Sequence, residues 1–174
     1  MNKPIMIVGQ PRTGSTSVAK MMQELGMFIG NDFMEVMEDG ECSYEDQEFV
    51  DISHAHIQKK IDREEFLHRL EERTHKRNHT HDLWGFKDPR AYKMIEDYKK
   101  IVKPRFIRTH RPVHKCMESM MRVFGWSNDK SYKTYNAINY ILDAGLEGEE
   151  VLNIYIEDLI NQTAMSKLKE YIYG

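Results

Sequence analysis

Short runs of apolar and β-branched residues recur along the chain, each bounded by polar or turn-forming residues. Runs of this length and composition are typical of strands. The pattern therefore predicts four strands, at residues 5–8, 83–86, 106–109 and 151–155.

Between these runs the apolar residues recur every three or four positions, which is the spacing of one helix face. Val18, Met21, Met22 and Leu25 form such a stripe, and Gly26 follows them as a C-cap glycine would. The predicted helices cover residues 15–25, 63–75, 113–124, 132–142 and 165–172.

Two of these helices carry start signals of their own. Asp62 and Glu65 have the spacing of a capping box, and Phe66 and Leu70 follow as a buried face. Pro112 stands in a first-turn position before the helix at residues 113–124.

Strands and helices alternate along the chain without an internal repeat or a linker-like segment. Such alternation predicts an α/β fold, a three-layer sandwich with a central parallel sheet. Ligands of such folds bind beyond the carboxyl ends of the strands. We expect one domain over residues 1–174.

Composition limits the classes of partner. The formal net charge is −3 with both signs interspersed, which argues against a nucleic-acid-binding face. Cys42 and Cys116 lack the spacing of a zinc or redox motif and are expected to be free thiols in a reducing compartment. No signal region and no apolar run of about 20 residues is visible, so we expect a cytoplasmic protein with no membrane attachment.

The segment from Gly9 to Ser17 joins the first strand to the first helix. Glycines at positions 9 and 14 frame it with the spacing of a nucleotide P-loop, and such a strand-loop-helix turn binds oxyanions at the helix N-terminus. Ser15 occupies the position where the ATP-binding motif carries lysine, and the loop's cation is Arg12.

The run from Gln10 to Thr16 resembles the loop by which sulfotransferases hold the 5′-phosphosulfate of 3′-phosphoadenosine 5′-phosphosulfate (PAPS). A second segment of that family reads strand, Arg-x-Pro, then a helix with serine eight residues after the arginine. Arg111 and Ser119 fit this pattern. The resemblance implies donor binding by the following residues: Pro11, Arg12, Thr13, Gly14, Ser15, Thr16, Ser17, Arg111 and Ser119.

Further runs are similar to those of compact bacterial or phage-like members of the family, in the same order along the chain. They are residues 25–32, 44–48, 84–90 (Trp-Gly-Phe-Lys-Asp-Pro-Arg) and 155–160. The chain departs from the family by lacking the glycine-rich C-terminal loop that covers the adenosine 3′-phosphate. The extra helices that usually shape the acceptor pocket are also absent or minimal. This leaves room for a large acceptor or for a partner chain that completes the cleft.

Sulfuryl transfer passes through a loose, in-line transition state much as phosphoryl transfer does, so catalysis rests on positioning and charge stabilisation. The resemblance places Arg12 at the phosphate oxygens and Lys87 near the sulfonyl group, and it implies no metal. For the base that accepts the acceptor's proton, Glu35 and Glu45 are equal candidates, followed by His54.

Other functions remain open. A P-loop kinase or nucleotide hydrolase would use ATP and Mg²⁺, with Ser15 or Thr16 and Asp88 near the metal, although Ser15 in place of lysine argues against it. A non-catalytic relative that binds an anionic ligand or nucleotide is the third reading. For the sulfotransferase reading we expect a small-molecule or glycan acceptor, and homo-oligomerisation stays open.

Overall fold

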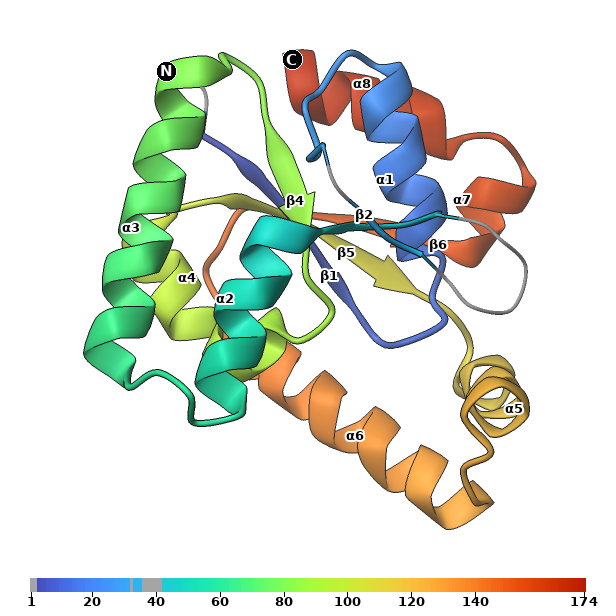
Figure 1. The fold of residues 1–174 in the computed structure, drawn as a ribbon. Coiled ribbons are helices and arrows are strands. Elements are labelled where there is room, and N and C mark those ends of the chain that lie inside the picture. The colour runs from blue at the N-terminus through green and yellow to red at the C-terminus, as the bar shows by residue number, and fades with distance from the viewer. Residues whose placement is uncertain (1–2, 32, 36–41) are drawn as a thin grey trace.

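The computed structural model describes residues 3–31, 33–35 and 42–174, apart from the side chains of residues 34, 35 and 42. Its centre is a four-stranded sheet in the order β4-β1-β5-β6, in which all neighbouring strands run parallel (Figure 1). These strands are β1 (Ile5–Gly9), β4 (Gly85–Lys87), β5 (Arg105–His110) and β6 (Val151–Tyr155). Each corresponds to a predicted strand and differs from it by at most two residues at either end.

The five predicted helices are all present, but others also occur. Helices α1 (Ser15–Glu24), α5 (Val113–Phe124) and α8 (Ala164–Tyr173) lie within one residue of the predicted bounds, whereas α3 (Arg63–Thr80) and α6 (Asn128–Gly145) are longer. The additional elements are β2 (Phe33–Glu35), β3 (Cys42–Asp46), α2 (Gln47–Ile57), the 3₁₀ helix η1 (Ala91–Met94), α4 (Ile95–Ile101) and α7 (Ile156–Ile160). Strands β2 and β3 pair antiparallel as a separate hairpin.

Side chains of the sheet alternate between two apolar cores. Ile5 and Ile7 pack on one face with residues of α1 and α8, while Met6 and Val8 pack on the other with residues of α2, α3, α4 and α6. Because successive side chains of a strand point to opposite faces, the apolar run of β1 serves both cores. The arrangement confirms the predicted three-layer α/β fold (Figure 1).

Helix α3 continues past the predicted end at His75 because its polar last turns are partly buried. Thr74 and Arg77 are only 6% and 4% exposed, and Asn78 Oδ1 accepts a hydrogen bond from Trp84 Nε1 at 2.9 Å. The start of α3 is as predicted, since Asp62 Oδ1 accepts a hydrogen bond from the backbone nitrogen of Glu65.

Candidate functional site

The loop between β1 and α1 is shaped by two glycines. A Cβ on Gly9 would lie 2.3 Å from Thr109 Oγ1, and one on Gly14 would lie 2.6 Å from Leu159 Cδ1. Gly14 is the N-cap residue of α1 with φ 91°, a left-handed conformation that glycine adopts without strain. Both positions therefore require glycine, as the sequence motif indicates.

Helix α1 begins without a side-chain cap and without an acidic residue in its first turn. The first N–H groups of a helix have no partner within the helix, and the helix dipole makes this end positive. The backbone N–H groups of Ser15, Thr16 and Ser17 consequently present a positive end to the loop, which suits an oxyanion.

Thr13 does not face outward from the loop. It is 1% exposed, and its Oγ1 donates a hydrogen bond to the carbonyl oxygen of Gln10 at 2.7 Å and lies 2.6 Å from Thr109 Oγ1. The hydroxyl therefore ties the loop to β5, and only the backbone amide of Thr13 is suited to a ligand.

The two arginine motifs meet directly. Arg12 Nε donates a hydrogen bond to Ser119 Oγ at 3.0 Å, and Arg111 Nη1 donates one to the carbonyl oxygen of Arg12 at 3.1 Å. Arg12 follows the end of β1 and Arg111 follows the end of β5, which are neighbouring parallel strands. The structure thus brings together these three residues of the predicted donor site.

Lys87 ends β4 on the other side of β1. Its Nζ donates hydrogen bonds to Thr16 Oγ1 at 3.0 Å and to the carbonyl oxygen of Ser43 at 2.7 Å, and the residue is 5% exposed. Glu45 Oε1 is 3.7 Å from the same nitrogen. The buried ammonium therefore lies beside the first turn of α1, where the loop presents its N–H groups.

Glu45 belongs to β3 and lies between two cations. Its Oε2 is 3.6 Å from Arg90 Nη1, and its other oxygen faces Lys87. Asp88, whose carboxylate is fully buried, also approaches Arg90 Nη1 to 3.6 Å. Two cations and two carboxylates are thus grouped at the end of β4.

The structure describes the side chain of only one of the other two candidates for the base. The side chain of Glu35 lies outside the described residues. His54 is half-buried in α2, and among the described residues no hydrogen bond or ion pair joins its ring to Lys87 or Glu45. Glu45 is therefore the candidate base that the described contacts bring to Lys87.

A buried ion-pair network follows Glu45 along the chain. Arg77 Nη2 lies 3.0 Å from Asp46 Oδ2 and 2.5 Å from Glu48 Oε2. Burial raises the pKa of Asp46 to about 6, against the opposing charge of Arg77. The sequence did not point to Arg77, because a polar helix segment carries no signal for a buried cation.

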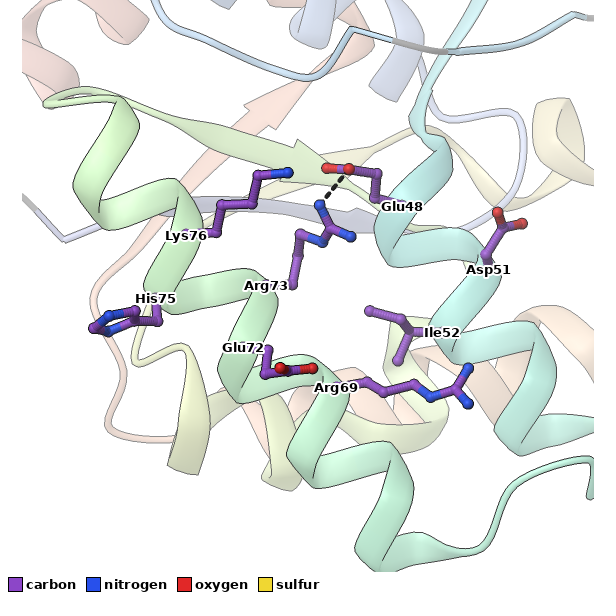
Figure 2. A pocket seen from close by; sticks show the side chains of 8 residues that line it. All are labelled: Glu48, Asp51, Ile52, Arg69, Glu72, Arg73, His75 and Lys76. Atoms are coloured by element: carbon purple, nitrogen blue, oxygen red, sulfur yellow. Dashed lines mark hydrogen bonds and ion pairs between the residues drawn. The ribbon is translucent and has the colours of Figure 1, made fainter.

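The groove shown in Figure 2 lies elsewhere, between α2 and α3, and has a volume of about 660 Å³. Glu48 from α2 and Arg73 from α3 form an ion pair across it. Its lining residues are Glu48, Asp51, Ile52, Arg69, Glu72, Arg73, His75 and Lys76. None of the predicted site residues lines this groove, so the predicted site is not in it.

Two kinds of feature are absent from the described part of the chain. No group of three or more histidine, cysteine, aspartate or glutamate residues within it is arranged to hold a metal ion. Nor does any helix there combine the length and apolar character that crossing a bilayer requires.

The sequence matches the family model described as the sulfotransferase family over residues 4–164. No curated protein sequence matches significantly.

Among solved structures, the sulfotransferase domain from the curacin biosynthetic pathway is similar at a TM-score of 0.65 and 14% identity, covering 98% of this chain and 74% of that one. The sulfotransferase domain from the Synechococcus PCC 7002 olefin synthase gives 0.66 and 14%, covering 98% and 73%. Shikimate kinase from Bacteroides thetaiotaomicron gives 0.61 and 10%, covering 98% of each chain. At these identities the structures show a shared fold.

Proposed function

The chain belongs to the sulfotransferase family, and from this premise we propose that it transfers a sulfuryl group from PAPS to a hydroxyl or amine of an acceptor. The observation that carries the proposal is the meeting of Arg12, Arg111 and Ser119 at the carboxyl edge of the sheet, with Lys87 on the other side of the same loop.

In this proposal the donor spans the two motifs. The N–H groups of residues 13–17 and the Arg12 guanidinium bind the 5′-phosphosulfate, since helix N-termini and arginine both suit oxyanions. Pro11 shapes the entry to the loop. Arg111 and Ser119 bind the 3′-phosphate, and their contact with Arg12 supports a nucleotide that reaches both groups.

The transfer step involves one bond made and one broken. The acceptor oxygen or nitrogen attacks the sulfur while the bond from sulfur to the bridging phosphate oxygen breaks, and the acceptor's proton passes to Glu45. Lys87 and Arg12 stabilise the charge that accumulates on the sulfonyl and leaving phosphate oxygens. The products are the sulfated acceptor and 3′-phosphoadenosine 5′-phosphate. The chemistry needs no metal.

Glu45 is our choice of base because its carboxylate lies 3.7 Å from Lys87 Nζ. A base must reach the acceptor's proton while the acceptor is aligned with the sulfonyl group. A carboxylate beside the ammonium that follows the sulfonyl charge meets this requirement. Among the described residues, no hydrogen bond or ion pair joins His54 to Lys87 or Glu45, and the side chain of Glu35 lies outside them.

A second candidate is a nucleotide kinase or hydrolase that uses ATP and Mg²⁺. The observation in its favour is the similarity to shikimate kinase over 98% of both chains. Ser15 stands where a kinase loop carries its lysine, and this weakens the kinase reading.

We further propose a cytoplasmic enzyme that acts on a small-molecule or glycan acceptor and has no nucleic-acid or membrane partner.

The test is an assay of sulfate transfer from PAPS to a panel of hydroxyl and amine acceptors. The wild-type protein is expected to sulfate at least one acceptor, and the Lys87→Ala variant is expected to lose most of this turnover. Phosphoryl transfer from ATP with Mg²⁺, in the absence of sulfuryl transfer, would assign the kinase function instead. Binding of the nucleotide without either transfer would indicate a non-catalytic relative.

A further inference from the structure

Arg90 Nη1 is shared by two carboxylates, at 3.6 Å from Glu45 Oε2 and 3.6 Å from Asp88 Oδ1. This nitrogen is buried and makes no hydrogen bond within the described residues. Its charge is therefore balanced by the two ion pairs. Glu45 faces a second cation, Lys87, whereas no second cation pairs with Asp88 among the described residues.

Asp88 is held by two helices and by the backbone of its own turn. Its Oδ2 accepts hydrogen bonds from Ser53 Oγ of α2 at 2.5 Å and from Tyr98 OH of α4 at 3.3 Å. Its Oδ1 accepts one from the backbone nitrogen of Arg90 at 2.9 Å. The carboxylate is consequently fixed in one position directly after Lys87.

Keeping a carboxylate in this buried place costs free energy, because burial disfavours the charged form. Burial raises the pKa of Asp88 and the charge of Glu45 adds to the rise, while the hydrogen bonds from Ser53 and Arg90 lower it. An asparagine of the same shape would accept the same backbone hydrogen bond without burying a charge. The cation beside the Asp88 carboxylate is Arg90.

The electrostatics at Glu45 indicate what a negative charge on Asp88 does there. A carboxylate beside two cations holds a proton weakly, which makes it a poor base. A negative charge on the far side of Arg90 opposes the field of that cation. Both carboxylates lie 3.6 Å from the same nitrogen of Arg90, so their charges are close to each other.

We infer that Asp88 is a positioning residue for the transfer reaction: its buried carboxylate offsets the charge of Arg90, so that Glu45 retains the proton affinity needed to take the acceptor's proton. This inference rests on the proposed function. Within the described part of the chain, the charged groups around Glu45 are Lys87, Arg90 and Asp88 from the end of β4, together with the Asp46, Glu48 and Arg77 network that follows it in the sequence.

The test compares the pH dependence of kcat for sulfuryl transfer in the wild type and in Asp88→Asn. In the variant, the acidic limb of the profile should lie at lower pH by about one unit, as expected when one negative charge on the other side of Arg90 is lost. Turnover on the plateau should fall roughly three- to tenfold, because the base is weaker. Affinity for 3′-phosphoadenosine 5′-phosphate should stay unchanged.

Two matched controls remove a hydrogen bond from the same carboxylate without removing its charge. Ser53→Ala and Tyr98→Phe are expected to lower the unfolding temperature while leaving the acidic limb close to the wild-type position. A limb that stays in place in Asp88→Asn, or that moves equally in all three variants, overturns the inference.

Asp88→Asn leaves Arg90 with one partner fewer and for that reason can fail to fold. In that event the limb is measured in the double variant Asp88→Asn/Arg90→Gln, in which the cation and the carboxylate that offsets it are both absent. Removal of both charges should leave the acidic limb close to the wild-type position, and a limb that moves by about one unit or more overturns the inference. A wild-type protein without transfer activity contradicts the proposed function and the inference together, whereas an active wild type with an unmoved limb in Asp88→Asn contradicts only the inference.

Discussion

Arg12 Nε lies 3.0 Å from Ser119 Oγ, although 107 residues separate them in the chain. The first follows β1 and the second lies in the helix after β5, so parallel pairing of these two strands brings them together. In the proposed function this contact joins the binding sites for the two ends of the donor.

Replacing Arg12 by alanine should lower kcat for sulfuryl transfer on the order of 10²-fold, because a preorganised donor to the transition state is lost. Turnover with saturating PAPS measures the effect. Arg122→Ala is the matched control, since Arg122 is exposed in the last turn of α5. Equal turnover in the Arg12 variant and the wild type would reject the role given to this guanidinium.

Replacing Ser119 by alanine should raise the Kd of 3′-phosphoadenosine 5′-phosphate roughly tenfold, the usual effect of losing a hydrogen bond to a charged group. Isothermal titration calorimetry measures this. Ser127→Ala serves as the control, because Ser127 caps α6 through the backbone nitrogen of Lys130 and belongs to no donor motif. Equal losses of affinity in both variants would show that Ser119 has no special part in donor binding.

The loop at residues 9–17 and the segment that carries Arg111 and Ser119 could be identified in the sequence because each is short and follows a strand, while donor binding by them stays a prediction. To predict the contact between Arg12 and Ser119, one must know that β1 and β5 are neighbours. The alternation of strands and helices in the sequence predicts a parallel sheet but does not give the order of its strands. For Thr13, the sequence did not predict where the side chain lies. Thr13 was expected among the donor-binding residues, yet its hydroxyl lies 2.6 Å from Thr109 Oγ1, a partner 96 residues away that no local pattern indicates.

The base and its surroundings were less predictable still. Glu45 and Glu35 were equal candidates in the sequence. The structure describes an ion pair of Glu45 with Lys87, whereas the side chain of Glu35 lies outside the described residues. Asp88 and Arg90 belong to a polar run after a strand, and such a run carries no signal for burial. The packing of α2 and α4 against this turn, through Ser53 and Tyr98, buries Asp88 instead.

Replacing Gly14 by alanine should destabilise the protein more than the same change at Gly148. Both glycines have positive φ, 91° and 76°, so both substitutions carry backbone strain of about 1 kcal/mol. A Cβ at Gly14 also meets Leu159 at 2.6 Å, whereas one at Gly148 meets nothing within 4 Å. Overpacking of this kind adds about 1–3 kcal/mol, which denaturant unfolding measures. Equal losses in the two variants would contradict the packing of α7 against the loop.

The free energy of unfolding of the wild type, minus that of the Asp46→Asn variant, should depend on pH. The pKa of Asp46 is raised from 3.8 to about 6 in the folded protein, so its contribution to stability is fully present below pH 3.8 and is lost as the pH rises through about 6. The difference in unfolding free energy, wild type minus variant, should therefore fall by about 3 kcal/mol across this range. A difference that is constant or that grows with pH would contradict the burial of this carboxyl.

The most direct test of the central claim is calorimetric titration of the wild-type protein with three nucleotides: 3′-phosphoadenosine 5′-phosphate, adenosine 5′-phosphate, and ATP with Mg²⁺. The account predicts that the doubly phosphorylated adenosine binds roughly tenfold or more tightly than either of the others, because only it supplies a phosphate to Arg111 and Ser119 as well as to the loop. Equal affinity for the first two nucleotides, or a preference for ATP with Mg²⁺, would contradict it.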